Sequence, residues 1–413
     1  MSDDTDIANG WERVPLGNVL TRIDAGKCVS CEERPAKPDE WGVLKVSAVT
    51  WTEFRQDENK VLPPDFDVPL DAEVKPGDFL ISRSNTTALV GAVTLVRETR
   101  PKLMLSDKTL RLVFDESAVS PEFLELALRG PVCRKFIEEN VGGASSSMKN
   151  ITQVAIRQIP VPLPPLGEQR RIAGILKEQM EAVERARVAA EEQLEAAKAL
   201  PAAFLRDVFN SNDAQTWPVR KLGEVSELLP AKSIATASDT EVRAVTTACL
   251  TEAGFEFDGI KTARMWQSDV ELATLAPGEV LIARSNTPEL VGRAARFPGA
   301  DDAVVASDLT IRIWATGPMT SRFLATYLSQ LFLTGYWKEK AGGASGSMKK
   351  ITRKQIAGLE VPVPDDQTQN RLIETVAART QAFNEIRASV DSQLKTINAL
   401  PAALLRQAFS GQL

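Results

Sequence analysis

The side chains that could carry out chemistry are few in this sequence. Its 413 residues include no histidine, which removes the commonest general base and every Ser-His or Cys-His nucleophilic pair. The four cysteines are Cys28, Cys31, Cys133 and Cys249. Cys28 and Cys31 form one Cys-x-x-Cys pair, but a structural zinc site needs a second pair or histidines nearby. We therefore expect ordinary cysteines, no metal site and no catalytic residue.

Hydroxyl, amide and basic side chains instead recur in two short motifs, each present twice. The sequence Arg-Ser-Asn-Thr stands at 83–86 and again at 284–287. Gly-Gly-Ala-Ser stands at 142–145 and at 342–345, each time followed closely by a serine and a lysine. Such groups can hold a phosphate, because glycines let backbone N–H groups approach it. They can equally hold a turn through side-chain to backbone bonds. Both alternatives remain open from the sequence.

These motifs belong to an internal duplication that covers nearly the whole chain. PGDFLISRSNTTALVGAV at 76–93 matches PGEVLIARSNTPELVGRA at 277–294, and ALPAAFLRDVF at 199–209 matches ALPAALLRQAF at 399–409. Repeats of this kind are the first thing to seek in a sequence. The segment from 18 to 75 and its counterpart in the second copy do not align. The scaffold is therefore duplicated, and one surface segment per copy is not.

Each copy is expected to be a mixed α/β domain followed by one long helix, which makes the fold class α+β. Apolar runs after Pro-Gly turns and alternating runs predict strands, and amphipathic stretches predict helices. The expected strands cover 79–82, 110–114, 280–283 and 309–314, and the expected helices cover 121–129 and 320–333. The polar segment NSNDAQT at 210–216 is expected to join the two copies.

The elements that must position both copies are two long helices with heptad spacing. The first is expected over 168–199, with Pro201 interrupting it, and would be roughly 48 Å long. Its two apolar rows are expected to be Leu176, Val183, Ala190, Ala197 and Ile172, Gln179, Ala186, Gln193, Leu200. In the second copy the rows are Val376, Phe383, Val390, Ile397 and Ile373, Thr380, Arg387, Leu394. We expect the two helices to form an antiparallel coiled coil with a pseudo-two-fold repeat.

Composition sets limits on the class of protein. Hydrophobic content of 43% and charged content of 25% are ordinary for a soluble chain, and no run of 18 apolar residues occurs. We expect a cytoplasmic location and no membrane partner. The net charge of -6 argues mildly against nucleic acid, but it averages over the chain. Two domains held more than one DNA turn apart favour a DNA reader, while a duplicated structural protein remains the plainer alternative.

The stretch PLPPLGEQRRIAGIL at 162–176, the preceding GGASSSMKNIT and the terminal LLRQAFSGQL add a family resemblance. The chain resembles the specificity (S) subunit of type I restriction-modification systems over essentially its whole length. The resemblance implies a non-catalytic subunit whose two domains read the halves of a split DNA site, with the coiled coil setting the gap. It implies two methyltransferase subunits that bring S-adenosylmethionine and two motor-nuclease subunits that use ATP and Mg. No cofactor is expected on this chain.

Comparison of the copies assigns candidate roles, because a residue that is the same in both cannot by itself specify two different half-sites. The candidates for contacts with the DNA backbone are therefore the matched residues Arg83, Ser84, Asn85, Thr86, Ser147, Lys149, Arg284, Ser285, Asn286, Thr287, Ser347 and Lys349. The candidates for reading base edges come from the unmatched segments. They are Lys27, Lys45, Ser47, Thr50, Trp51, Arg55, Lys232, Arg243, Thr246, Thr247, Lys261 and Arg264. Trp51 and Trp266 suit a core as well as a groove.

The expected domains are 1–160 and 213–360 for target recognition, and 161–212 and 361–413 for the conserved spacer helices. A scaffold that docks enzyme subunits without reading sequence is the competing function. The repeat fits both functions, and the unmatched segments favour sequence reading. An independent enzyme is disfavoured, since the chain lacks a GxxxxGK[ST] phosphate loop and an Asn-Pro-Pro-Tyr motif as well as histidine.

Overall fold

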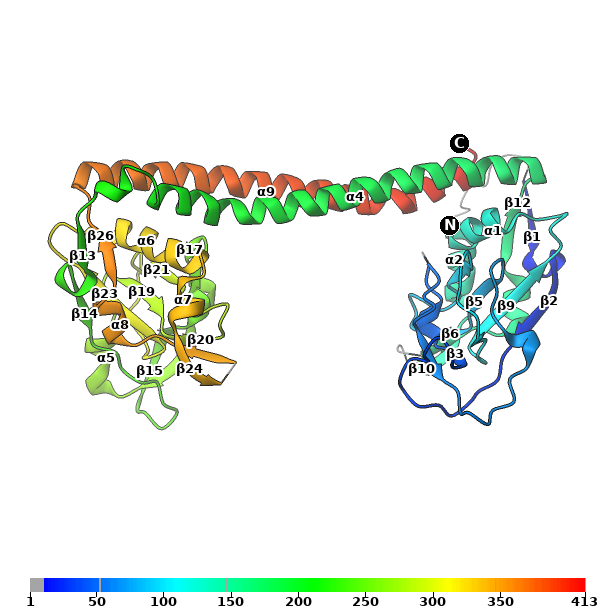
Figure 1. The fold of residues 1–413 in the computed structure, drawn as a ribbon, viewed down its shortest axis with the longest axis horizontal. Coiled ribbons are helices and arrows are strands. Elements are labelled where there is room, and N and C mark those ends of the chain that lie inside the picture. Colours follow the sequence, from blue (N-terminus) through cyan, green and yellow to red (C-terminus); the bar gives the residue numbers. More distant parts are fainter. Residues whose placement is uncertain (1–10, 52, 146–147, 346, 413) are drawn as a thin grey trace. The chain divides into compact units, whose positions relative to one another are not determined.

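The computed structural model describes residues 11–51, 53–145, 148–345 and 347–412. The chain forms two compact units: unit 1 contains 1–189 and 393–413, and unit 2 contains 190–392. Each unit holds one globular domain together with part of the two long helices, α4 (Leu166–Phe209) and α9 (Asp366–Phe409) (Figure 1). Within the described ranges, no helix combines the length and apolar character that a bilayer crossing would need.

The domain of unit 1 is built on a four-stranded antiparallel sheet in the order β2-β9-β5-β7. These strands are β2 (Leu20–Ala25), β9 (Thr109–Phe114), β5 (Phe79–Ser82) and β7 (Val93–Leu95). A second sheet contains β4 (Asn59–Val61), β3 (Gly42–Leu44) and β8 (Leu103–Met104). The remaining strands are β1 (Glu12–Pro15), β6 (Ser84–Asn85), β10 (Gly142–Ser145), β11 (Met148–Asn150) and β12 (Pro160–Leu163). The helices are α1 (Pro121–Arg129), α2 (Pro131–Glu139) and α3 (Gln153–Gln158), with 3-10 turns at Leu16–Asn18, Val46–Ala48 and Leu70–Ala72.

The domain of unit 2 repeats this plan. Its four-stranded sheet has the order β14-β23-β19-β21, formed by β14 (Ser226–Leu229), β23 (Thr310–Ala315), β19 (Val280–Ala283) and β21 (Ala294–Arg296). The second sheet contains β18 (Lys261–Met265), β15 (Thr240–Val245) and β22 (Val304–Ala306). The other strands are β13 (Val219–Lys221), β16 (Leu250–Thr251), β17 (Gly254–Phe255), β20 (Ser285–Asn286), β24 (Gly342–Ser345), β25 (Met348–Lys350) and β26 (Glu360–Pro362). The helices are α5 (Gln267–Ala273), α6 (Ser321–Leu333), α7 (Tyr336–Lys340) and α8 (Arg353–Ala357), with 3-10 turns at Ala214–Thr216, Leu222–Glu224, Thr247–Cys249 and Phe257–Gly259.

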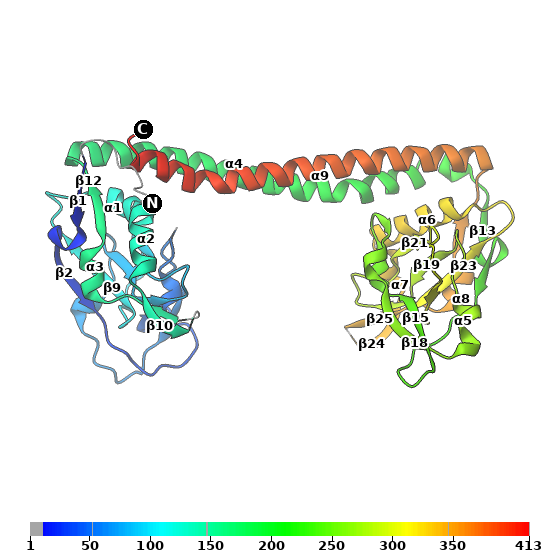
Figure 2. The same ribbon diagram turned by 180° about the vertical axis from the view of Figure 1, so that it is seen from behind.

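The central strands β5 and β19 are apolar apart from Ser82 at the end of β5, because both of their faces are buried. Successive side chains of a strand point to opposite faces. Phe79 and Ile81 therefore enter the core that contains residues of α1 and α2, while Leu80 enters the core shared with the second sheet. Figure 2 labels α1, α2 and β9 of this sheet. In β19, Ile282 and Leu281 divide between two cores in the same way. The strands and helices predicted from the sequence are confirmed here, and so is the α+β class.

The prediction that Pro201 interrupts the first long helix is wrong. Both α4 and α9 contain an internal proline, Pro201 and Pro401, and both continue to a phenylalanine eight residues later. A proline inside a helix costs about 3 kcal/mol, because it removes one N–H and crowds the preceding turn. Apolar packing beyond the proline offsets this cost: Leu205 is buried, and the rings of Phe204 and Phe383 lie 5.9 Å apart. Each helix has 44 residues and is therefore roughly 66 Å long.

The predicted seam of α4 is half right. The row that begins at Leu176 is buried or partly buried, as predicted. The second row lies one residue later than predicted: Ala173, Met180 and Leu194 are covered, while Ala186 and Gln193 are exposed. Ile172 lies in the same buried cluster as Ala173, together with residues of the domain of unit 1 and of α9. A heptad search on the sequence does not separate burial against a domain from burial in a helix pair. The predicted rows of α9 are covered except at Arg387.

In each unit the start of one long helix lies beside the end of the other, so the pair is antiparallel there. In unit 1, Leu176 of α4 shares a core with Leu405 and Phe409 of α9. The ring of Phe409 packs against Phe123 of α1 with centroids 5.7 Å apart. In unit 2, Phe209 at the end of α4 packs in the same way against Phe323 of α6, at 5.9 Å. The repeated C-terminal sequences thus anchor each helix end in a domain core.

Candidate nucleic-acid interface

The Gly-Gly motif forms a β-hairpin in unit 1. Strand β10 pairs with β11, and β11 pairs with β6, which places Lys149 opposite Asn85. Gly143 has a φ of 122°, and a Cβ there would collide with the backbone oxygen of Met148. The Lys149 ammonium donates to the carbonyl of Gly143 at 2.7 Å, which closes the hairpin. The glycine is therefore required by the hairpin itself. The candidate Ser147 lies outside the described residues.

Unit 2 repeats the hairpin with the same register. Strand β24 pairs with β25, and β25 pairs with β20, which places Lys349 opposite Asn286. Ser347 lies in the exposed turn before β25. Met148 and Met348, which begin the second strand of each hairpin, are 43% and 46% exposed. Both units therefore present a hairpin of matching sequence with a lysine on its second strand.

The Arg-Ser-Asn-Thr motif builds the strand that carries the hairpin. Ser84 and Asn85 are buried, and the Ser84 hydroxyl donates to Asn150 of β11. The Asn85 Oδ1 accepts from the backbone N–H of Thr86 at 2.8 Å. In unit 2 the Asn286 Oδ1 accepts from the N–H of Thr287 at 2.9 Å, while Ser285 is partly buried. This geometry favours the turn-forming alternative for the two asparagines.

The arginines of this motif are more accessible than the asparagine of unit 1. Arg83 is partly buried, and its backbone bonds connect it to Lys108 and to Ile151. Arg284 is also partly buried and donates to the carbonyl of Asp308 at 3.3 Å. Both arginines therefore keep their role as candidates for contacts with a phosphate.

In unit 1, several base-reading candidates lie next to carboxylates. The Ser47 hydroxyl donates to Glu58 at 2.6 Å, and the Lys45 ammonium lies 3.8 Å from the same carboxylate. Arg55 pairs with Glu53 at 2.7 Å, and both side chains are more than half exposed. Exposed ion pairs contribute little stability, so these groups can exchange an internal partner for an external one at low cost.

Two further candidates of unit 1 have internal roles. The Thr50 hydroxyl donates to the carbonyl of Glu53 at 3.0 Å, which holds a turn. The Trp51 indole N–H donates to the carbonyl of Ala88 at 2.9 Å. The Arg134 guanidinium lies over the Trp51 ring at 4.6 Å from its centroid. Trp51 therefore has both a hydrogen bond and a cation contact within its own domain.

In unit 2, the candidates with charged side chains lie on and around the second sheet. Lys232 pairs with Asp269 at 2.6 Å, and both side chains are partly buried. Arg243 on β15 pairs with Asp302 at 2.8 Å, and both side chains are exposed. Lys261 is exposed at the start of β18, the neighbouring strand. Arg243 therefore lies on the central strand of this sheet and Lys261 on the neighbouring edge strand.

The other candidates of unit 2 make bonds to backbone groups. The Arg264 guanidinium donates to the carbonyls of Ser238 and Asp239, at 2.7 and 3.1 Å. The Thr246 hydroxyl donates to the carbonyl of Gly259 at 2.9 Å. Trp266, which was open between core and groove, is 48% exposed just before α5.

In both units one asparagine joins the matched hairpin to the unmatched segment. The Asn85 amide donates to the carbonyl of Val46, next to Ser47, at 3.4 Å. The Asn286 amide donates to the Thr247 hydroxyl at 3.1 Å. The structure therefore brings the matched candidates and part of the unmatched candidates to one place in each domain.

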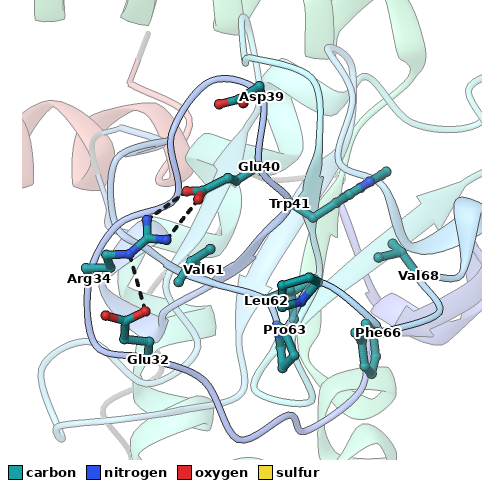
Figure 3. Close-up of a pocket in the computed structure, with 11 residues that line it drawn as sticks. Glu32, Arg34, Asp39, Glu40, Trp41, Val61, Leu62, Pro63, Phe66 and Val68 are labelled. Atoms are coloured by element: carbon teal, nitrogen blue, oxygen red, sulfur yellow. Dashed lines mark hydrogen bonds and ion pairs between the residues drawn. The ribbon is translucent and has the colours of Figure 1, made fainter.

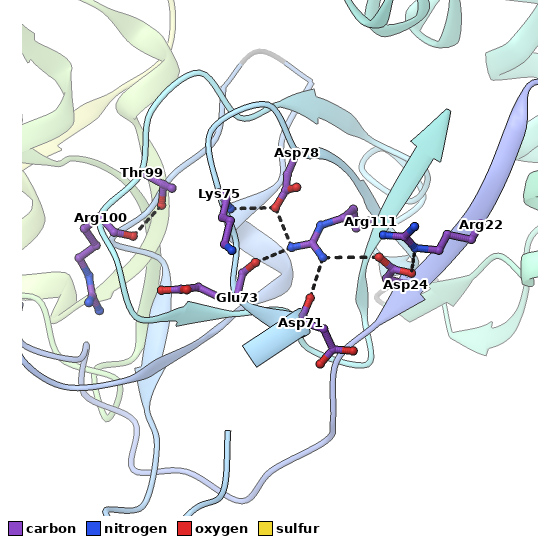
Figure 4. A network of polar contacts seen from close by, with 9 residues as sticks. All are labelled: Arg22, Asp24, Asp71, Glu73, Lys75, Asp78, Thr99, Arg100 and Arg111. Atoms are coloured by element: carbon purple, nitrogen blue, oxygen red, sulfur yellow. Dashed lines mark hydrogen bonds and ion pairs between the residues drawn. The ribbon is translucent and has the colours of Figure 1, made fainter. Parts of the chain in front are cut away.

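Sequence reasoning missed a buried arginine at the centre of the sheet in unit 1. Arg111 on β9 donates to the Asp78 carboxylate at 2.7 Å and to the carbonyl of Asp71 at 2.8 Å (Figure 4). It also reaches the carbonyl of Glu73 and, at 3.5 Å, the Asp24 carboxylate. These bonds attach the end of the unmatched segment to the sheet.

Arg312 on β23 has the same place in unit 2. Its guanidinium bonds both oxygens of Glu279, at 2.8 and 2.7 Å, and both side chains are almost completely buried. It also donates to the carbonyls of Leu272 and Thr274. The signal in the sequence was an arginine between apolar residues of a strand in both copies, at 110–112 and 311–313.

A cavity of about 450 Å³ opens within the unmatched segment of unit 1 (Figure 3). Arg34 bonds both oxygens of Glu40 at its edge, and this guanidinium lowers the pKa of the Glu40 carboxyl to about 2. Trp41 and Phe66 line the apolar side, and the ammonium of the candidate Lys27 lies 5.9 Å from the Phe66 centroid. The acidic lining does not suit a phosphate.

Metal ligands do not gather anywhere in the described parts of the chain: no group of three or more Cys, Asp or Glu side chains there could hold an ion. Among the cysteines, Cys133 and Cys249 are buried, while Cys28 is exposed and Cys31 partly buried. Burial raises the pKa of the Cys133 thiol to about 12. The chemistry available at this surface is hydrogen bonding and charge pairing by hydroxyl, amide, ammonium and guanidinium groups.

Residues 70–195 match the family model of the type I restriction modification DNA specificity domain. Over 170 residues the chain is 35% identical to the EcoEI type I restriction enzyme specificity subunit of Escherichia coli, an alignment that covers 41% of this chain and 29% of that protein. The chain thus spans less than a third of that relative. It is also 20% identical to the StySPI specificity subunit of Salmonella potsdam, over 98% of this chain and 90% of that one.

Two solved structures share the fold. One chain belongs to a study of complex assembly and conformational transition of the type I restriction-modification system, with a TM-score of 0.72, 20% identity and coverage of 98% and 99%. The HsdS subunit of Thermoanaerobacter tengcongensis gives a TM-score of 0.64 at 20% identity, with 98% coverage of both chains. At this identity the two likenesses concern the fold.

Two domains of one plan, each holding the start of one long helix and the end of another, define a class of duplicated proteins with two long helices. Residues 70–195 thus match a type I restriction modification DNA specificity domain, and the relatives that resemble this chain are specificity subunits of type I restriction enzymes.

Proposed function

We propose that this chain selects the DNA sequence on which a type I restriction-modification complex acts. Each domain reads one half of a bipartite, asymmetric site, through the unmatched segment and the hairpin beside it. The long helices set the gap between the halves, and their exposed charged faces dock the methyltransferase subunits. The complex works in the cytoplasm on double-stranded DNA.

One observation carries this proposal. In both domains an asparagine of a matched strand bonds a segment that differs between the copies. A duplicated frame with two different inserts is what two different half-sites require, because identical contacts cannot distinguish them. The basic and hydroxyl groups of these inserts are donors for base edges and phosphates.

The chemistry of the complex belongs to partner subunits. Two methyltransferase subunits would supply S-adenosylmethionine, and two motor-nuclease subunits would use ATP and Mg. The names of the relatives support this assembly, since they are specificity subunits of type I restriction enzymes. The contribution of this chain is binding and positioning, with no step of bond making.

The methylome of cells that express this chain with its methyltransferase tests the proposal. A bipartite methylated motif with a fixed gap is the expected result. Methylation without sequence bias would favour the alternative of a docking scaffold that reads no sequence.

Exchange of 18–75 for the corresponding segment of another such subunit tests the division of labour between the domains. Only one half of the motif should change. A change in both halves would contradict independent reading by the two domains.

A further inference from the structure

A buried glutamine at the start of each long helix is left unexplained by the DNA-reading surface. In unit 1, Gln169 lies in the first turn of α4 and is 1% exposed. Its Oε1 accepts from the backbone N–H of Ser120 at 2.9 Å. Its Nε2 donates to the carbonyls of Ala118 at 3.1 Å and Pro164 at 2.8 Å. One side chain therefore bonds two backbone groups of the domain, at Ser120 and Ala118, and the carbonyl of Pro164 just before the helix.

Gln369 does the same in unit 2, at the start of α9. It is fully buried, and its Oε1 accepts from the backbone N–H of Thr320 at 3.0 Å. Its Nε2 donates to the carbonyls of Pro318 at 2.7 Å and Pro364 at 2.9 Å. The Thr320 hydroxyl adds a fourth bond at 2.7 Å.

The residues around the two glutamines differ, while the bonds are the same. Leu-Gly-Glu precedes Gln169, and Asp-Gln-Thr precedes Gln369. In both units the bonded backbone precedes the first turn of a domain helix, with Ser120 capping α1 and Thr320 capping α6. The junction therefore depends on the amide itself rather than on its neighbours.

We propose that Gln169 and Gln369 are positioning residues that fix how each recognition domain is rotated on its long helix, and so fix the gap that the protein accepts between half-sites. This inference rests on the proposed function. Apolar contacts at the same junction, such as Ile172 in unit 1, hold the parts together without fixing an angle, because burial has no direction. Hydrogen bonds from one amide to three backbone groups do have a direction.

An amide is the side chain that these groups need. It offers an acceptor to one N–H and two donors to two carbonyls, and all three are used. Glutamate would keep the acceptor but would place a carboxylate against two carbonyls. Methionine would keep the volume and leave all three backbone groups without their partner. Either change should loosen the angle while the apolar contacts keep the domain attached.

The test uses the full chain assembled with its methyltransferase subunits. The methylated motif of the wild type gives the two half-sites, and a series of duplexes then varies the gap by one and two base pairs in each direction. The variants are Gln169→Met, Gln369→Met and Gln169→Glu. Gln193→Met is the matched control, because Gln193 is exposed on the same helix as Gln169.

The expected result is a loss of gap discrimination. The ratio of the methylation rate at the best gap to the rate one base pair away should fall about tenfold in the variants, or about 1.4 kcal/mol. The rate at the best gap should fall much less, and the control should keep the wild-type ratio. Gln169→Glu keeps a polar side chain of the same length, so it extends the test if Gln169→Met fails to fold.

Three results would overturn the inference in distinguishable ways. A parallel fall at every gap, with an unchanged ratio, would assign the glutamines a purely structural role. An unchanged profile in all variants would show that apolar packing alone fixes the angle. A wild-type complex that methylates without preference for two separated half-sites would refute the proposed function and this inference with it.

Discussion

At the scale of single residues, the buried ion pair of Arg312 and Glu279 should be essential for the stability of unit 2. Their side chains are 4% and 1% exposed. Arg312→Met leaves Glu279 buried without its partner, which should lower the free energy of unfolding by about 3–5 kcal/mol. Chemical denaturation followed by circular dichroism measures the loss.

Two matched variants sharpen this prediction. Arg243→Met removes an ion pair whose side chains are 46% and 77% exposed, and should cost about 1 kcal/mol or less. Replacing both members of the buried pair, as Arg312→Met with Glu279→Leu, should recover part of the lost stability. Equal losses from Arg312→Met and Arg243→Met would contradict the assigned role.

The cysteines should differ in reactivity by burial. Burial raises the pKa of Cys133 to about 12, whereas Cys28 is exposed. Because the thiolate is the reacting form and Cys133 is buried, alkylation at pH 8 should modify Cys28 much faster than Cys133. Peptide mapping by mass spectrometry measures both rates. Rapid labelling of Cys133 in the native protein would show that its site opens to solvent.

The same raised pKa has a consequence for stability at high pH. In the unfolded chain the Cys133 thiol titrates near its ordinary value of 9.0, and in the folded chain near 12. Below pH 9 both states hold the proton, so the stability is unaffected. Between about pH 9 and 12 the unfolded state loses the proton first, and the free energy of unfolding should fall.

At the scale of elements, the helix seam provides a test between neighbouring positions. Leu194 is partly buried and Gln193 is exposed, the reverse of what the heptad rows predicted. Leu194→Lys should lower the melting temperature, because it removes an apolar contact from the helix pair. Gln193→Lys should leave it unchanged. Thermal unfolding of the two variants compares the registers, and a larger effect at Gln193 would restore the predicted one.

The sequence predicts an element well where one physical cause determines the pattern. Burial on both faces makes 79–81 and 280–283 apolar, and the strands at 79–82 and 280–283 begin and end as predicted. The helix seam was harder to predict, since the neighbouring residues Ile172 and Ala173 are both buried in one cluster with residues of the domain and of α9. Pro201 was misleading because tertiary packing can override the low helix propensity of proline. Phe204 and Leu205, which follow the proline in the helix, both pack against other residues.

The candidate site was predictable in outline for a related reason. Comparison of the two copies separates the residues that both copies share from the segments that differ, and the bonds of Asn85 and Asn286 join these two parts in space. The comparison does not show which hydrogen-bond donors already have a partner within the protein. From the sequence alone, Arg55 and Trp51 are equally suitable candidates for reading bases. Only their contacts in the structure distinguish them.

At the scale of the whole molecule, the proposed spacer makes a quantitative prediction. Removing one heptad from each long helix shortens it by about 10 Å, or about three base pairs of DNA. Seven residues are close to two helical turns, so each domain keeps nearly the same rotation on its helix. Three base pairs, however, rotate the duplex by about 100°. The preferred gap should therefore shorten by about three base pairs, with weaker binding because the second half-site faces away.

Removing three heptads from each helix separates length from rotation. The loss of about 31 Å corresponds to roughly nine base pairs, close to one DNA turn, so the second half-site again faces the protein. Binding should then be tighter than with one heptad removed, at a gap about nine base pairs shorter than in the wild type. Gel-shift titration of duplexes with graded gaps measures both quantities. An unchanged gap with intact binding in either variant would show that the helices do not set the separation.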